Sequence, residues 1–446
     1  PLFWRARSRV ESSLKPSRSP SVTSMDMKRQ REFAFWRTSA SLFSGSLLAH
    51  VIPFMLGPLL TRLYAAAAFG HYALFAAVAA NVAVLSCARY DFALPLARTE
   101  EDVSRLMALC AWILLCVVGV SALCVTAAVV SFSVSPYWLL LPLAVAASGA
   151  IQWFTMWATR AQRFNAISAA RLTMYGGGAI LQAGAGAGAL RGGVFGLVAG
   201  QLVAATAALC WFRKPPPPGG WAALSSVSVA ELGRTAARFH RFPLLNGPHA
   251  FAGALQDTLT IAVLVALTGD AAAGYWGLVL RYLKAPATLI GGAISQTLYP
   301  RLINASVPEA LKAISSVIRV TGLMAAALAL VLFLYGPSMF ALVFGAQWHE
   351  AGELARALAP YVAMHFVASP LSVVTLACDR QDWALRVALL GQLGFMTALI
   401  LGVHLNGLIA GAWAVSGVMT IYFAWFVWRL PVEFRSANRR EGKHES

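Results

Sequence analysis

Long apolar runs dominate the sequence and limit the folds open to it. Two of them, Ala254–Leu267 and Ala271–Leu298, follow one another near the middle of the chain, and each reaches membrane length with its flanks. A helix needs roughly 20 apolar residues to cross the hydrocarbon of a bilayer. Only 12% of the residues are charged, against roughly 25% in soluble domains. The sequence therefore predicts an all-α integral membrane protein.

About twelve transmembrane helices are expected, in two six-helix lobes. We divide the chain into a basic disordered segment 1–35, an N-terminal lobe 36–212, a basic, proline-rich cytoplasmic linker 213–241, a C-terminal lobe 242–430 and a cytoplasmic tail 431–446. The first 24 residues lack the apolar core of a signal peptide. The expected helices lie near 40–60, 71–94, 106–130, 137–158, 168–189 and 193–212, and near 243–267, 271–298, 318–344, 357–377, 384–403 and 408–428.

An internal repeat supports the division into two lobes. The stretch Ala65–Phe75 is similar to Asp270–Leu280, and Arg191–Gln201 is similar to Asn406–Ser416. Because each set contains an even number of crossings, the two lobes share one orientation and are related by an axis along the membrane normal. Two such lobes facing one another predict a central cleft.

The positive charges predict the orientation of the helices. Of 35 Lys and Arg residues, thirty fall in segments that are cytoplasmic if both termini lie inside, and three fall in outer loops. Lys and Arg collect in cytoplasmic loops, so the sequence predicts an N-in, C-in topology. The same placement explains the net charge of +17 as attraction to an anionic inner leaflet, without nucleic acid as a partner.

Three charged residues lie inside the two central runs. Arg281 and Lys284 are three residues apart and share one helix face, and Asp257 lies in the preceding run. Each costs about 3 kcal/mol near the bilayer midplane unless it faces a partner or water. We expect Arg281 and Lys284 to bind a diphosphate in the cleft, with ion pairing or snorkelling as the alternatives. Asp257 either couples transport to an ion or pairs with these cations.

Further polar residues lie inside predicted helices. Asn246 is expected to face the cleft as part of the substrate site. His50 and His365 are candidates for ion coupling, because the ordinary pKa of histidine lies near 6.5; hydrogen bonding to a neighbouring helix is the alternative.

Charged residues at helix ends are candidate gates. Arg89 and Asp91 end the second predicted helix on the cytoplasmic side, where they form either a salt bridge or an inner gate. Arg62, at the outer end of the first helix, is either part of an outer gate or an anchor at the membrane interface.

No catalytic or metal-binding pattern is evident. The six cysteines lack paired CxxC spacing, so neither a disulfide framework nor a metal site is predicted, and no cofactor is implied. A polysaccharide polymerase or glycosyltransferase is the alternative from another class, but such an enzyme needs a larger loop than the outer loop expected over Gly345–Arg356. We expect a transporter that is not an enzyme.

Three stretches carry a resemblance to a known family. PLLTRLYAAAAFGHYALF (Pro58–Phe75), ARYDFALPLARTEEDVSRL (Ala88–Leu106) and AAAGYWGLVLRYLKAPATLIGGAISQTLYPRL (Ala271–Leu302) resemble the polysaccharide biosynthesis proteins, or O-antigen-type flippases, of the multidrug/oligosaccharidyl-lipid/polysaccharide (MOP) superfamily. The resemblance runs from about Phe35 to Trp428.

The resemblance implies a flippase that carries a polyprenyl-diphosphate-linked oligosaccharide, such as a lipopolysaccharide repeat unit, to the outer leaflet by alternating access. It also implies a bacterial inner membrane location and contact with a polysaccharide polymerase complex. The alternatives within the superfamily are a cation-coupled multidrug exporter and a flippase for the peptidoglycan precursor.

Overall fold

The structure is a computed structural model that describes residues 48–132, 134–188, 193–214, 216, 220–221, 224, 227–304, 306–378 and 380–441. Over these residues the chain forms helices and contains no β-strand, which confirms the predicted all-α class. The predicted disordered segment 1–35, Arg191 and the last residues of the predicted tail lie outside the described part of the chain.

Eight helices in the described part are long and apolar enough to cross a membrane, and a shorter apolar helix, Leu48–Leu63, precedes them. They indicate a multi-pass membrane protein. The total of twelve crossings and the internal repeat stay predictions. The eight spans are Ala66–Leu85, Glu100–Phe132, Pro136–Arg160, Val194–Phe212, Ala250–Thr268, Val307–Phe344, Ala346–Ala377 and Trp383–Ser436.

The first helices pack together as an N-terminal bundle, in which α2 contacts α4 and α7, α3 contacts α4, and α6 contacts α7. A π-helical turn, η3 (Leu172–Gly177), joins α5 to α6 without a break in the helical path. The bundle consists of Leu48–Leu63, α2 (Ala66–Leu85), η1 (Tyr90–Leu96), α3 (Glu100–Phe132), η2 (Pro136–Leu140), α4 (Leu141–Arg160), α5 (Phe164–Arg171), η3, α6 (Gly178–Ala187), α7 (Val194–Ala208) and η4 (Leu209–Phe212).

The remaining long helices form a C-terminal bundle around α13, which packs against α11, α12 and α14. Within α14, Asn406 and Gly407 are not helical, and Gly407 has a φ of 78°. Glycine adopts this conformation without steric cost, so it allows a bend that divides α14 into two helical segments. The bundle consists of α10 (Arg241–Thr268), α11 (Asp270–Asn304), α12 (Val307–Phe344), η5 (Ala346–Trp348), α13 (His349–Ala377) and α14 (Gln381–Glu441).

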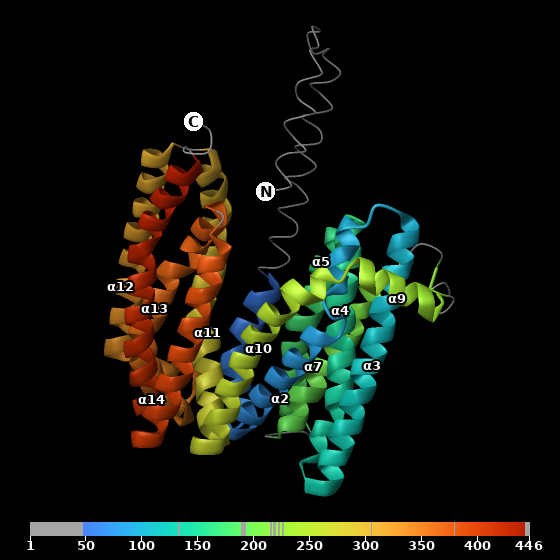
Figure 1. Cartoon of the computed structure of the whole chain (residues 1–446). Helices are drawn as coiled ribbons and strands as arrows, with labels where there is room; N and C mark the ends of the chain where they lie inside the picture. Colours follow the sequence, from blue (N-terminus) through green and yellow to red (C-terminus); the bar gives the residue numbers. More distant parts are fainter. Residues whose placement is uncertain are drawn as a thin grey trace, which may run out of the picture.

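The two bundles meet where α2 packs against α10 and α11 (Figure 1). Gly70 and Gly274 allow this close approach. A Cβ atom on Gly70 would lie 1.8 Å from the carbonyl oxygen of Asp270, and one on Gly274 would lie 2.0 Å from that of Ala66. The ribbons of the bundles diverge toward the end of the molecule at which α14 ends (Figure 1).

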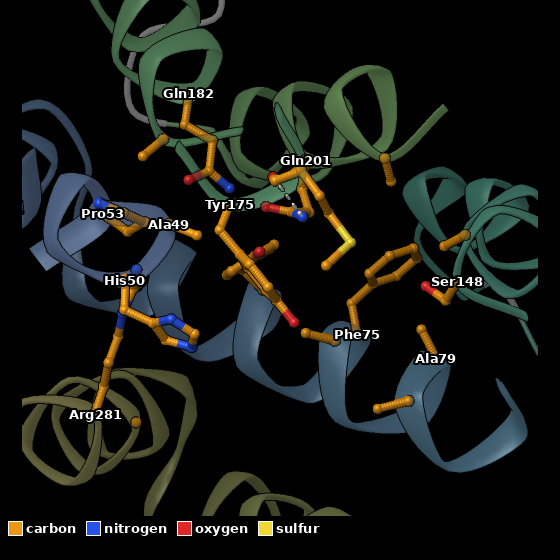
Figure 2. A pocket seen from close by; sticks show the side chains of 18 of the residues that line it. Ala49, His50, Pro53, Phe75, Ala79, Ser148, Tyr175, Gln182, Gln201 and Arg281 are labelled. Carbon is orange, nitrogen blue, oxygen red and sulfur yellow. Dashed lines mark hydrogen bonds between the residues drawn. The ribbon is translucent and has the colours of Figure 1, made fainter. Parts of the chain in front are cut away.

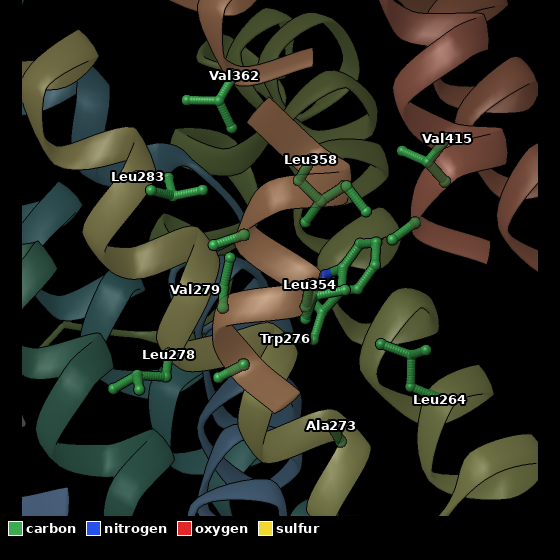
Figure 3. Close-up of a cluster of buried hydrophobic side chains, with 14 of the residues drawn as sticks. Leu264, Ala273, Trp276, Leu278, Val279, Leu283, Leu354, Leu358, Val362 and Val415 are labelled. Atoms are coloured by element: carbon green, nitrogen blue, oxygen red, sulfur yellow. The ribbon is translucent and has the colours of Figure 1, made fainter. Parts of the chain in front are cut away.

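The largest buried cluster lies around Trp276 of α11, whose side chain is 1% exposed. Figure 3 shows Trp276 beside Leu354 and Leu358 of α13, with Leu264 of α10 nearby. Because lipid is as apolar as this cluster, its helices are held together by close packing of side chains and not by removal of the ring from water. The cluster fixes α10, α11 and α13 relative to one another, and α11 carries the predicted phosphate-binding residues.

Part of the predicted linker forms a short amphipathic helix, α9 (Val229–Arg238), which begins with a capping box between Ser228 and Glu231. The hydrogen bonds from Ser228 lower the pKa of Glu231. The apolar face of α9 buries Leu232 against the N-terminal bundle, and Arg238 forms an ion pair of 2.7 Å with Asp102 of α3. The linker is therefore anchored to the N-terminal bundle.

Several helix boundaries differ from the predicted ones. The second predicted helix, 71–94, ends at Leu85, and a 3-10 helix follows it. The ninth begins at Val307 instead of near 318, because a capping box between Ser306 and Glu309 starts it earlier. The outer loop predicted over Gly345–Arg356 is mostly helical, since α13 begins at His349.

Candidate functional site

A cavity of about 900 Å³ lies between the N-terminal bundle and helices α10 and α11. Figure 2 shows its side chains converging from the first described helix, α2, α4, α6, α7 and α11. Its walls combine apolar residues with a small number of polar ones, as is usual for a site that binds a small molecule. The polar and charged residues that line it are His50, Tyr72, Ser148, Gln152, Tyr175, Gln182, Gln201, Asp257, Arg281, Lys284 and Thr288.

Arg281 and Lys284 form the cationic wall of this cavity. Both lie on one face of α11, and Figure 2 shows Arg281 reaching toward the cavity beside His50. The ammonium of Lys284 lies 5.7 Å from the ring centre of Tyr361, a cation–π distance. Among the described residues no carboxylate lies within ion-pair distance of either cation. Their charges are thus available to an anionic ligand.

Asp257 and His50 line the same cavity. Asp257 lies on α10 and forms no ion pair with Arg281 or Lys284 in the described part of the protein. The pairing alternative for this carboxylate is thus absent from this conformation. The ring centre of His50 lies 5.4 Å from that of Tyr175. A carboxylate, an imidazole and two cations therefore share one space.

His365 is not among the described residues that line this cavity. His365 lies on α13, where its ring packs 5.6 Å from that of Phe423 and 6.1 Å from that of Tyr361. Its Nδ1 atom is buried and has no hydrogen-bond partner in the described part of the chain. Asn246 lies in α10, and its side chain is outside what the structure describes.

Arg89 and Asp91 do not pair with each other in the described structure. Arg89 has a φ of 64° and places its guanidinium 5.1 Å from the ring centre of Phe92. Asp91 is 0% exposed and accepts a hydrogen bond of 3.1 Å from Nε2 of Gln152, while its Oδ1 has no partner. Burial raises the pKa of the Asp91 carboxyl. The expected salt bridge is thus replaced by a buried carboxylate held by a cavity glutamine.

Gln182 and Gln201 also line the cavity, although they are not among the residues predicted from the sequence. The available signal was glutamine inside an apolar helical run, which is costly in a membrane unless the amide is hydrogen bonded or faces water. No group of three or more His, Cys, Asp or Glu side chains is placed to hold a metal ion in the described residues.

Comparison with known proteins identifies the fold through structure alone. No protein-family profile matches the chain, and no curated protein matches it in sequence. An inward-facing multidrug resistance MATE family transporter of the MOP superfamily superposes with a TM-score of 0.64 at 11% identity, over 90% of this chain and 95% of the other. The lipid II flippase MurJ in an inward closed conformation gives 0.64 at 11% identity, over 90% and 89%.

A crystal structure of MATE in complex with MaL6 gives a TM-score of 0.57 at 13% identity, over 91% and 97% of the two chains. This chain therefore shares the fold of these MATE and MurJ structures. At 11–13% identity, the similarity establishes the fold and does not identify a substrate.

The predicted N-in, C-in topology places one end of each bundle outside, and we call these the outer ends. They are joined by hydrogen bonds that we call the outer latch. The hydroxyl of Thr61 donates to the carbonyl of Phe344 at 2.9 Å. The side chains of Gln347 and Trp348 donate to the carbonyl of Thr61 at 2.6 Å and 3.0 Å. Arg62 lies 3.5 Å from two carbonyl oxygens near the end of α12. The predicted gate residue Arg62 thus contacts the other bundle. Thr61, Gln347 and Trp348 were not predicted as gate residues from the sequence.

An ion pair lies near the same interface. Nε2 of His71 on α2 is 3.2 Å from Oδ2 of Asp270 at the start of α11. Both side chains are about one-third exposed, so water screens their attraction. The outer ends are therefore held mainly by neutral hydrogen bonds and by the glycine contacts of α2 and α11.

Proposed function

We propose that the chain is a membrane carrier that moves a lipid-diphosphate-linked oligosaccharide from the inner to the outer leaflet by alternating access. The observation that carries this proposal is the cationic wall: Arg281 and Lys284 line a cavity of about 900 Å³ and have no carboxylate partner in the described structure. Unpaired cations inside a membrane protein are costly, and an anionic ligand offsets that cost.

The chemistry of the two cations suits a diphosphate. Arginine donates two parallel hydrogen bonds to phosphate oxygens, and lysine adds a compact positive charge. Both project from α11, which the cluster around Trp276 holds in place. In this proposal the diphosphate and its sugars occupy the cavity while the prenyl tail stays in lipid.

The membrane potential favours the outward direction. Moving about two negative charges outward across ~100 mV, inside negative, releases roughly 4–5 kcal/mol. The outer latch joins the bundles at their outer ends, so the conformation described here corresponds to loading from the inside. This proposal includes an inner-membrane location with an anionic inner leaflet, and a polysaccharide polymerase complex as the receiver of the product.

Asp257 favours a second candidate, a cation-coupled exporter of the multidrug type. Its carboxylate is exposed to the cavity and carries no ion pair in the described structure, so it is able to bind a cation or a proton. A flippase for the peptidoglycan precursor also fits the cationic wall, because that precursor carries a diphosphate too. The exporter would bind its ligand through the carboxylate of Asp257, whereas either flippase would bind its ligand through Arg281 and Lys284.

The test is ligand binding by the purified full chain in nanodiscs, with undecaprenyl diphosphate as the probe. Arg281→Ala and Lys284→Ala are each expected to weaken binding about tenfold, the effect of losing charge-assisted hydrogen bonds. Asp257→Asn is expected to leave the affinity for undecaprenyl diphosphate unchanged or to increase it, because a negative charge that lines the cavity is removed.

Arg301→Ala is the matched control, since Arg301 lies on the same helix and does not line the cavity. Equal affinity of wild type, R281A and K284A for the diphosphate contradicts the proposed site. Binding of a lipophilic cation that is lost only in D257N supports the exporter instead.

A further inference from the structure

The cavity wall opposite Arg281 has a different chemistry from the cationic wall. Three glutamines of the N-terminal bundle line the cavity, Gln152 on α4, Gln182 on α6 and Gln201 on α7. Figure 2 shows Gln182 and Gln201 on the far side of the cavity from Arg281, with His50 and Tyr175 between them. We call Gln152, Gln182 and Gln201 the glutamine wall.

The hydrogen bonds of these glutamines fix which end of each amide faces the cavity. Nε2 of Gln182 donates to the carbonyl of Leu197 at 2.8 Å, and Nε2 of Gln201 donates to that of Met174 at 3.3 Å. A carbonyl oxygen only accepts, so the NH₂ group must face it. Nε2 of Gln152 donates to the Asp91 carboxyl at 3.1 Å. In each of the three glutamines, the amide NH₂ group donates the hydrogen bond to the protein.

The acceptor ends remain open to the cavity. None of the three Oε1 atoms accepts a hydrogen bond within the described protein, and none is among its buried polar atoms that lack a partner. Each of these oxygens therefore has some accessible surface, and we infer that this surface faces the cavity that its residue lines. The glutamine wall presents three neutral acceptors, while Arg281 and Lys284 present only donors.

We propose that the glutamine wall is the subsite for the hydroxyl-rich sugar of the ligand, next to the phosphate subsite on α11. A glycosyl diphosphate has the matching polarity, because its phosphates only accept and its hydroxyls donate. Aromatic side chains that line the same cavity, Tyr72, Phe75 and Tyr175, offer apolar ring faces to the C–H groups of a sugar. The inference rests on the proposed function, since it assigns the sugar end of that same ligand.

The experiment compares two probes that differ only in the sugar. The diphosphate probe is farnesyl diphosphate with a methyl ester on its terminal phosphate, and the sugar probe carries N-acetylglucosamine at that position, so both have the same charge. Each is titrated against the full chain in nanodiscs. Wild type is expected to bind the glycosylated probe more tightly. Gln201→Met, which keeps the side-chain length and removes the acceptor, is expected to lower affinity for the glycosylated probe about fivefold and to change affinity for the plain diphosphate less than twofold.

Two further variants separate a lost contact from a damaged fold. Ser148→Ala removes a hydroxyl that lines the same side of the cavity at little steric cost, and is expected to act in the same direction as Gln201→Met. Gln296→Met is the control, because Gln296 is an exposed glutamine of α11 outside the cavity lining. Thermal unfolding of each variant confirms that it is folded.

The outcomes distinguish this inference from the proposed function. Equal affinity of wild type for both probes, or equal losses for both probes in Gln201→Met, overturns the sugar subsite and leaves the phosphate site standing. Failure of R281A and K284A to weaken either probe overturns the proposed function itself. Gln201→Met could instead change only how sodium ions affect probe affinity, while the glycosylated probe still binds more tightly than the plain one. In that case the glutamine wall binds a cation and the inference is wrong.

Discussion

Asp91 has an unusual environment, because one of its oxygens is buried without a partner in the described part of the chain and the other accepts a hydrogen bond from Gln152. Burial is the main reason that the pKa of this carboxyl is raised from its ordinary value of 3.8. A carboxyl whose pKa is raised by folding holds its proton more tightly in the folded state. Its contribution to stability is therefore greatest below that ordinary value and declines as the pH rises to the folded pKa.

Asp91→Asn keeps the acceptor for Gln152 and removes the ionised form, so we expect it to stabilise the protein at neutral pH. The midpoint of thermal unfolding in detergent is expected to rise by about 2 °C at pH 8, and the difference from wild type is expected to shrink as the pH falls. Glu350→Gln, at an exposed position of α13, is the control. A lower midpoint for D91N at pH 8 would show that the carboxylate is needed as a counter-charge for Arg89.

At this scale the sequence identified charged residues better than neutral ones. Arg281, Lys284 and Asp257 were predicted from the cost of charge in an apolar run, and His50 from the ordinary pKa of histidine. All four line one cavity. Neutral polar side chains such as that of Gln201 cost less free energy to bury than charged ones. Their presence in an apolar run is therefore weaker evidence of a binding site. Their partners are backbone carbonyls from distant turns, which no local pattern reveals.

Among the helices, the contact between α2 and α11 fixes how closely the two bundles approach, because Gly70 and Gly274 leave no room for a side chain. Gly274→Ala is expected to destabilise this interface by about 1–3 kcal/mol, the usual cost of overpacking. The measurement is thermal unfolding together with the affinity for undecaprenyl diphosphate. Gly292→Ala on the same helix has free space around its Cβ and is the matched control. Similar unfolding midpoints for both variants would contradict the packing described here.

The existence of the helices was predictable from apolar length, whereas their ends were not. The capping box of Ser306 and Glu309 extends α12 into a stretch that looked like a polar loop. The break after α2 depends on Ala88 and Arg89 in positive-φ conformations, which tertiary packing imposes on residues that do not favour them. Local composition carries little information about either feature.

On the scale of the whole molecule, the outer latch is expected to set the balance between conformations. Thr61→Val preserves the shape of the side chain and removes the hydrogen bond to Phe344. We expect it to raise the population with separated outer ends about fivefold, as one lost neutral hydrogen bond would. Pulsed electron spin resonance between labels at Ala65 and Leu342 measures this population.

Thr206→Val is the control for that measurement. Its hydroxyl also bonds a carbonyl, that of Leu202, but within α7 and away from the latch. Unchanged distance distributions in both variants would mean that the latch does not control opening.

In the outer latch, every acceptor is a main-chain oxygen, and none of the three shorter bonds involves an ionisable group. Amino-acid replacements along the tip of α12 can therefore accumulate without erasing the acceptors, provided that the helix keeps its register. A slide or rotation of α12 by one residue would carry its carbonyl away from Thr61. Closure of the outer ends thus depends on the position of the α12 backbone. A fall in pH alone would not break these three hydrogen bonds, because none of their groups is ionisable.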